Sequence, residues 1–453
     1  MRGRTTLGVA GTVALAVGLI GPPVAAQDPV EIRWYCCLGT GEDPAQLPAE
    51  QAVVDAFNAS HPDIHLVFET VTYDAARDTL ATQIASATPD IVGPVGVGGA
   101  EAFHGQWLDL APLIESAGYD LSQYDAGAVD FYRIGDEGQV GIPFAIYPSM
   151  VWYKADLFEE AGLNPPPHAY GEPYVWPDGT EAPWDYDTVR ELAKLLTVDE
   201  NGLDATQDGF DATKIVQYGC EPQRDDLRGL GAYFGAGQLL GADGTTVEIP
   251  QAWADGWKYA YDAMWNEHVT MPDAVFRDPE FFGGGYAFFS GHVAMSENFL
   301  WTTYGVADAG DDWDLAAIPA WNGTTTSPLN ADTFRILKDS KHPEEAFTVL
   351  SYLLGEASDE LLAVYGGMPA RTADQDAFFE TLAGQFPQAV DWQVAKDSVA
   401  YADNPNFEAY MPAYNESLDT LGKYLSAWTT TPGLDMDAQI ESLRAELQAI
   451  WDR

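Results

Sequence analysis

One stretch in the first third of the chain constrains the fold more than any other. Residues 138–162 read GQVGIPFAIYPSMVWYKADLFEEAG. They predict a small-residue strand over 139–142 that ends at Pro143, and an aromatic strand over 145–153 followed by a short helix. We expect Pro143 and Pro148 to bracket a turn between these strands, because proline lacks the N–H that a ladder needs. Chain direction or sheet membership can change there, so we interpret the stretch as a crossing between two lobes.

The length of the chain also favours two lobes. Its 453 residues exceed the roughly 250–300 residues that one hydrophobic core usually serves. Residues 1–26 carry basic residues, then an apolar run too short to span a bilayer, then an A-x-A-like end, which is typical of a cleaved signal peptide. We therefore expect a soluble exported protein, periplasmic or extracellular.

The charge is strongly acidic. Cleavage at that point would leave 19 basic against 70 acidic residues, a formal charge of −51. Such a chain repels nucleic acid and anionic lipid, and it disfavours anionic ligands unless the site is locally basic. The 14 Trp, 22 Tyr and 20 Phe exceed what a core requires, so some aromatic side chains are expected to line a binding cleft.

The N-terminal part alternates strands and helices. Strands are expected over 30–37 and 64–71 and before Gly93, with helices over 49–60 and 73–87 between them. This order predicts an α/β fold with mostly parallel pairing. Ligands of open α/β sheets lie beyond the carboxyl ends of the strands, which indicates Gly39, Thr40 and Glu42 after the first strand, and 93–99 after the third. The GVGG of 96–99 lacks the Lys-Ser/Thr of a phosphate loop, and its simplest use is close backbone approach to a ligand or a neighbouring loop.

Neither cysteine nor metal chemistry organises the chain. Cys36, Cys37 and Cys220 are too few for a disulfide framework, and we favour unpaired thiols, because pairing adjacent cysteines strains the backbone and a bridge between lobes would block their motion. The seven histidines form no ligand cluster, and no cofactor is expected. Asp199, Asn201 and Asp204 surround a glycine turn that could hold calcium, but the spacing departs from the EF-hand and we favour an acidic turn.

Several segments resemble the extracellular solute-binding proteins of sugar-type ABC importers, the maltose-binding-protein-like family 1. The crossing stretch is similar to the passage of that family from its first lobe to its second. FNASHPDIHLV (57–67), FFSGHVAM (288–295) leading to Trp301, WDLAAIP (313–319), SKHPEEAF (340–347) and GGMPAR (366–371) match further motifs in order. The resemblance therefore covers nearly the whole chain after the signal peptide.

The resemblance implies a two-lobed clam-shell, the type II periplasmic-binding-protein fold. Each lobe is α/β and discontinuous in sequence, with a hinge between them. Lobe one would comprise 27–144 and 322–368, and lobe two 149–320 and 372–453. A helix over 251–266 is dense in Trp and Tyr at helical spacing, and there core packing is the default interpretation.

The resemblance also suggests ligand-binding residues. Trp301 stands where relatives present a tryptophan to the sugar, after Glu297 and Asn298, and Tyr233 stands where relatives contribute a stacking aromatic from the second lobe. With the loop residues the set is Trp301, Tyr233, Tyr147, Asn298, Glu297, Thr40, Glu42, Asp332 and Arg371. Aromatic faces suit the C–H surfaces of a sugar, and Asp, Glu and Asn suit its hydroxyls.

The function that follows is capture of a mono- or oligosaccharide by hinge closure and delivery to an ABC permease with its ATPase. We expect a monomer that is not an enzyme. The same fold binding a polyamine, peptide or other small solute is an alternative. A secreted glycoside hydrolase is a remoter one, since 70 acids always allow a carboxylate pair to be proposed but no catalytic signature appears.

Overall fold

The computed structural model describes residues 1, 3, 28–36, 38, 44, 46–86, 88–135, 137–282, 287–304, 310 and 312–453. Nearly all of the predicted signal peptide lies outside these residues, as do Cys37, Gly39, Thr40 and Glu42. No helix within the described ranges is both long and apolar enough to cross a membrane.

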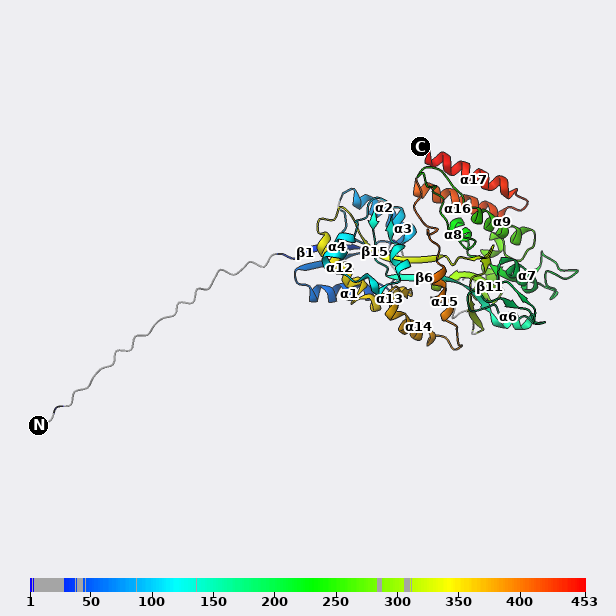
Figure 1. Cartoon of the computed structure of the whole chain (residues 1–453), viewed down its shortest axis with the longest axis horizontal. Coiled ribbons are helices and arrows are strands. Elements are labelled where there is room, and N and C mark those ends of the chain that lie inside the picture. Colours follow the sequence, from blue (N-terminus) through cyan, green and yellow to red (C-terminus); the bar gives the residue numbers. More distant parts are fainter. Residues whose placement is uncertain are drawn as a thin grey trace.

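The first half contains the predicted strand–helix alternation. β1 (Val30–Tyr35) pairs in parallel with β2 (Ile64–Glu69) and with β3 (Ile91–Gly96), and α1 (Leu47–Ser60) and α2 (Tyr73–Ile84) connect them. Alternation in β1 buries Ile32 and Trp34, and α1 buries Val53 and Phe57 on its apolar face. α12 (Pro343–Leu354) and α13 (Ser358–Tyr365) return to this half, as Figure 1 shows.

The crossing strand is β6 (Ala145–Lys154), and all ten of its residues are buried. Over Ala145–Pro148 it pairs with β15 (Leu329–Ile336), and over Ser149–Tyr153 with β11 (Val293–Phe299). The partner strand of β6 therefore changes at Pro148, although β6 stays within one sheet. The predicted turn between Pro143 and Pro148 is wrong, because Pro148 lies inside β6 at the point where one partner strand gives way to the next.

One continuous sheet results, in the order β2-β1-β3-β15-β6-β11-β10-β9. β12 (Trp313–Ala316) and β16 (Met368–Pro369) pair with β6 outside this order. The predicted strand over 139–142 is reduced to β5 (Gly138–Gln139), which pairs with β4 (Arg133–Ile134). Residues 140–144 are instead irregular and lead directly into β6.

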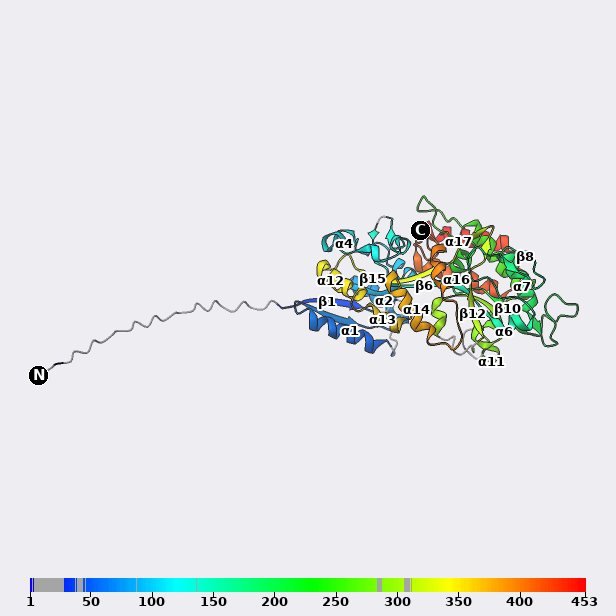
Figure 2. The same ribbon diagram turned by 60° about the horizontal axis from the view of Figure 1, so that its bottom comes forward.

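The second half packs helices against β10 (Ile215–Glu221) and β11. α7 (Tyr186–Leu196) contacts both strands, while α8 (Leu227–Ala232), α9 (Gln251–Trp265), α16 (Tyr414–Thr430) and α17 (Met436–Trp451) form a layer visible in Figures 1 and 2. The prediction that α9 is a core helix is confirmed, since Trp253 and Trp257 are buried.

The remaining elements are short. Their bounds are α3 (Val97–Glu101), α4 (Ala111–Ala117), η1 (Leu121–Gln123), α5 (Ala126–Asp130), α6 (Ala155–Glu160), β7 (Tyr174–Val175), β8 (Glu181–Ala182), β9 (Val198–Asp199), α10 (Asp273–Phe276), α11 (Pro279–Phe282), η2 (Ala287–Ser290), η3 (Leu300–Tyr304), β13 (Ala320–Trp321), β14 (Thr324–Thr325), η5 (Thr372–Asp374), α14 (Gln375–Ala383), α15 (Gln393–Ser398) and η6 (Val399–Tyr401).

The expectation of unpaired thiols is half wrong. Cys36, at the end of β1, is disulfide-bonded, whereas Cys220 is free. No bridge joins Cys36 to Cys220. The expectation failed because pairing depends on where the side chains point, which spacing in the sequence does not give.

Candidate functional site

The crossing strands bring several polar and aromatic side chains to one face of the sheet. Tyr147 lies opposite Asn330, and Ala145 lies opposite Asp332, which is itself opposite Gly96 of β3. Directly opposed residues of antiparallel strands share a face, and so do residues two apart. Tyr147, Asn330 and Asp332 therefore lie on the same face where the chain passes between its halves.

Trp301 is joined to this face through two aromatic contacts. β11 ends at Phe299, and Trp301 follows in η3 with its ring centroid 4.4 Å from that of Phe299 and 5.6 Å from that of Tyr147. Trp301 is half-buried, whereas Tyr147 is buried and Phe299 is fully so. The indole is thus held against the crossing strand and keeps part of its surface accessible.

Asp332 is the carboxylate of this face that has no protein partner. Within the described residues it makes neither a side-chain hydrogen bond nor an ion pair, and it retains partial exposure. Burial, followed by the nearby charge of Glu408, raises its pKa to about 7. A carboxylate that is desolvated yet partly accessible can accept hydrogen bonds from a ligand.

Glu408 approaches from the chain segment before α16. Its Oε2 accepts a hydrogen bond of 3.0 Å from the backbone N–H of Gly98 in α3. Burial raises the pKa of Glu408, and the charge of Arg228 opposes that rise. A Cβ on Gly98 would lie only 2.6 Å from Glu408 Oε1, so the expected close backbone approach of the GVGG segment is confirmed, and here its partner is a neighbouring loop.

Two expected ligand contacts lie in the interior of the second half. Tyr233 is fully buried, with its ring against Phe299, so it presents no face for stacking in this structure. Glu297 is 3% exposed and accepts a 2.6 Å hydrogen bond from the hydroxyl of Tyr186. Burial raises the pKa of Glu297 to about 7. Tyr233, which follows α8, and Glu297 of β11 are therefore part of the packing between sheet and helices. Glu297 lies opposite Val151 of β6 and so shares the sheet face of Tyr147, but the Tyr186 side chain of α7 covers it there.

Asn298 and Arg371 are also engaged elsewhere. The Oδ1 of Asn298 accepts from the following backbone N–H, of Phe299, at 2.9 Å. The backbone of Arg371 forms an isolated antiparallel β-bridge with that of Tyr124. The Nε of Arg371 lies 3.7 Å from Asp374 Oδ2. Among the expected residues that the structure describes, Trp301 and Tyr147 are in contact, and Asp332 lies on the same face.

The sequence analysis missed Asn330, Glu408 and Arg228, whereas Gly98 lies in the segment 93–99 that it had indicated. The register of β15 against β6 is what adds Asn330, and sequence does not give register across such separations. The aromatic and Pro-rich stretch YADNPNFEAYMPAY (401–414) was the one available signal for Glu408.

In the segment 199–211, where calcium was the alternative, the carboxylates of Asp199 and Asp204 accept hydrogen bonds from the backbone. The carboxylate of Asp199 accepts from the N–H groups of Asn201, Leu203 and Asp211 at 2.8–3.1 Å, and Asp204 accepts from that of Thr206. These contacts make an acidic turn, as favoured from the spacing. Among the described residues no group of three or more His, Cys, Asp or Glu is placed to hold a metal.

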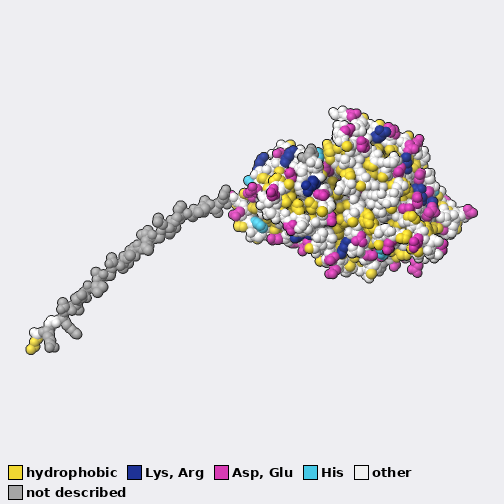
Figure 3. Space-filling view, in the orientation of Figure 1, with side chains coloured by type: hydrophobic (Ala, Val, Ile, Leu, Met, Phe, Trp, Pro, Cys, Tyr) yellow, Lys and Arg dark blue, Asp and Glu magenta, His cyan; other side chains and the backbone are white. Residues whose placement is uncertain are grey.

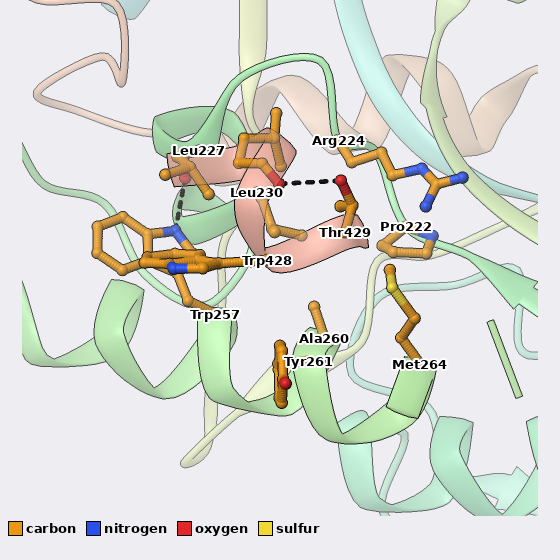
Figure 4. Close-up of a pocket in the computed structure, with 11 residues that line it drawn as sticks. Pro222, Arg224, Leu227, Leu230, Trp257, Ala260, Tyr261, Met264, Trp428 and Thr429 are labelled. Atoms are coloured by element: carbon orange, nitrogen blue, oxygen red, sulfur yellow. Dashed lines mark hydrogen bonds between the residues drawn. The ribbon is translucent and has the colours of Figure 1, made fainter. Parts of the chain in front are cut away.

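The cavities described for the second half are weaker candidates for a ligand site than the face of the crossing strands. The cavity of Figure 4 lies between α8, α9 and α16, is lined mostly by apolar side chains such as Leu230 and Trp257, and measures about 20 Å³, room for one water. The guanidinium of Arg224 points away from it. A larger surface hollow of about 410 Å³ lies beside α6 and β9, bordered by Leu157 and Asp204, far along the sheet from β15.

Several solved structures share this architecture. M. tuberculosis UspC matches with a TM-score of 0.69 and 21% identity over 93% of this chain and 100% of its own. A Listeria monocytogenes ABC substrate-binding protein, solved with cycloalternan, matches with a TM-score of 0.67 and 19% identity over 93% and 99%. These similarities show the two-lobed α/β fold that the sequence predicted.

Sequence relatives point the same way. The lactose-binding protein of Rhizobium radiobacter is 26% identical over 378 residues, 77% of this chain and 79% of its own length. The profile of bacterial extracellular solute-binding proteins matches residues 41–360. Such proteins bind rather than transform their substrates, which agrees with the prediction that the chain is not an enzyme. The chain belongs to the family of bacterial extracellular solute-binding proteins.

Proposed function

We propose that this protein captures a mono- or oligosaccharide between its lobes and delivers it to the permease and ATPase of an ABC importer. The observation that carries the proposal is the half-exposed indole of Trp301 against Tyr147, on the face that also holds Asn330 and Asp332. This face lies on the strands that join the two halves, where a closing hinge would enclose a ligand.

The chemistry of the face suits a neutral sugar. An indole covers the C–H surface of a pyranose, while an amide and an unpaired carboxylate offer directed acceptors to its hydroxyls. The acidic surroundings of Asp332 and Glu408 disfavour a phosphorylated ligand. The acidic surface seen in Figure 3, where Asp and Glu are scattered over both halves, adds to this effect.

Two of the similar proteins support a saccharide. One sequence relative is named as a lactose-binding protein, and one structural neighbour was solved with cycloalternan. In keeping with them, we propose export through the signal peptide of residues 1–26, a monomer, and lobes at 27–144 with 322–368 and at 149–320 with 372–453. Closure would then be a rotation about β6 and β15, with the bound ligand stabilising the closed form.

A polyamine is the second candidate. The two carboxylates of Asp332 and Glu408, with raised pKa values that a nearby cation would lower, favour a positively charged solute. Trp301 could stack on an alkylammonium chain as well as on a sugar. Binding experiments therefore need both ligand classes.

The test is a thermal-shift screen of the mature protein against mono- and oligosaccharides, polyamines and peptides, followed by calorimetry on each hit. We expect stoichiometric binding of a saccharide and recovery of that saccharide intact after many hours. Tighter binding of spermidine than of any saccharide would overturn the sugar assignment. Catalytic conversion of the bound saccharide would overturn the assignment as a transport receptor.

A further inference from the structure

Besides the shared strands, one further segment joins the two halves beside the candidate site. Residues 403–415, which we term the strap, run from η6 to the start of α16 across the crossing strands (Figure 1). Asp403 anchors the beginning of the strap: its carboxylate accepts from the N–H of Leu329 at 2.8 Å and from that of Phe407 at 2.7 Å. The strap is thereby fixed to the first residue of β15.

The strap also contacts α2, α3 and the loop after α3 in the first half. Glu408 accepts from the N–H of Gly98 at 3.0 Å. The ring of Tyr410 stacks on that of His104, with centroids 4.0 Å apart and planes 18° from parallel. At the end of the strap, Asn415 Oδ1 accepts from Nη1 of Arg77 in α2 at 3.4 Å. In the order of the strap, the contacts reach α3, then the loop that holds His104, and then α2.

The other side of the strap belongs to the second half. α16 packs against α8, α9 and α17. From α8, the guanidinium of Arg228 attracts Glu408 and lies 5.6 Å from the ring centroid of Tyr414. Arg228 is itself held by Asp226, whose Oδ2 accepts from its Nε at 3.0 Å and from its Nη2 at 2.6 Å. Glu408 is therefore a charge fixed by the second half and bonded to the first.

We propose that the strap is a latch that favours the closed arrangement of the lobes and thereby sets ligand affinity without touching the ligand. The proposal rests on the hinge of the proposed function. When only the closed form binds well, the apparent affinity equals the intrinsic affinity multiplied by the fraction already closed. Contacts between the lobes raise that fraction for every ligand alike. Loss of a charge-assisted hydrogen bond and its electrostatic support should weaken binding by about 3- to 30-fold.

Two substitutions break the latch in different ways. Glu408→Ala removes the acceptor and leaves Arg228 paired with Asp226. Gly98→Ala keeps the N–H but places a methyl group 2.6 Å from Glu408 Oε1 and 3.2 Å from the hydroxyl of Tyr414, which forces the strap away. The matched control is Glu416→Gln, which removes the same charge one turn into α16, where the partner is the C-terminal Arg453.

The experiment is pulsed electron–electron double resonance, which measures the distance between two spin labels. The labels are attached at Asp63→Cys and Glu181→Cys in a Cys220→Ser background. Both labelled positions are exposed, and they lie on opposite halves. Without ligand, we expect a short-distance population that Glu408→Ala and Gly98→Ala reduce and Glu416→Gln retains. Calorimetry should then show the same fold-loss of affinity for two different saccharides.

An unchanged ligand-free distance distribution in both latch variants would overturn the proposal. Unequal losses for the two saccharides would also overturn it, because they would place Glu408 in contact with the ligand. The distance measurement uses ligand-free protein, so its result bears on the latch whether or not a saccharide binds. If the latch variants shift but no saccharide binds, the latch stands and the sugar-capture function falls.

Discussion

Trp301 is the side chain with the most binding surface to lose. Trp301→Ala should weaken saccharide binding by about 2–4 kcal/mol, or roughly 30- to 1000-fold, since it removes both buried apolar area and the stacking contact. Calorimetric affinity and the melting temperature should be measured together on the variant. A core tryptophan would instead cost about 3–5 kcal/mol of folding stability.

The control is Trp265→Ala. Trp265 is also half-buried, but it joins α9 to α16 by donating from Nε1 to the carbonyl of Trp428 at 2.8 Å. We expect it to lower the melting temperature and leave affinity unchanged. If Trp301→Ala behaves in the same way, then Trp301 is a packing residue and the site lies elsewhere.

Glu297 provides a test of pH dependence. Its folded-state pKa, raised to about 7, exceeds the value of about 4.5 that an exposed glutamate has, so the folded protein holds this proton more tightly than the unfolded chain. Its contribution to stability is complete below about pH 4.5 and is lost as the pH rises through about 7. Between pH 5 and 8, wild type should lose roughly 2–3 kcal/mol more of its free energy of unfolding than Glu297→Gln.

Urea denaturation of both proteins at the two pH values measures this difference. The glutamine keeps an acceptor for the Tyr186 hydroxyl, so the variant removes the titration and preserves the hydrogen bond. Identical losses in the two proteins would show that Glu297 does not titrate in this range.

For individual residues, the sequence indicated which side chains could bind a ligand better than it indicated what would surround each of them. Trp301 and Tyr147 were expected and do meet, because a motif places the first and the crossing strand holds the second. Tyr233 and Glu297 were expected beside them and are buried, because helices distant in sequence pack over them, as the hydroxyl of Tyr186 does over Glu297. Glu408 was missed for the same reason, since it is 310 residues from Gly98 along the chain.

Helix packing in the second half depends on glycine, whose lack of a side chain lets two helices approach closely. A Cβ on Gly231, in α8, would lie 2.5 Å from Cγ of Trp253 in α9. Gly231→Ala should therefore cost about 1–3 kcal/mol of stability, despite the better helix propensity of alanine. Gly422, in α16, has no atom within 4 Å of such a Cβ, so Gly422→Ala should stabilise by about 0.5–1 kcal/mol.

Thermal denaturation of the two variants gives the comparison. Opposite signs are expected from the same chemical change in two helices. Stabilisation by both substitutions would mean that α8 and α9 are not in the close contact described here.

Elements with a strong local pattern were predictable. α1, α9 and the alternating strands carry periodicities that any partner would respect. The region before β6 was not. Residues 140–144 contain strand-forming types and touch β15, but they form no regular ladder with it. Pro148 is tolerated inside β6 where the neighbouring strand changes.

At the scale of the whole molecule, the claim is that two halves joined by shared strands close on a saccharide. β6 and β15 connect the halves, so closure should move the lobes as rigid bodies and leave secondary structure intact. Compaction without refolding is the signature that distinguishes this motion from coupled folding.

Small-angle X-ray scattering, with and without the tightest-binding saccharide, tests this directly. At a ligand concentration that calorimetry shows to be saturating, the radius of gyration should fall while the circular dichroism spectrum stays the same. An unchanged radius of gyration at saturation would contradict capture by closure between the lobes.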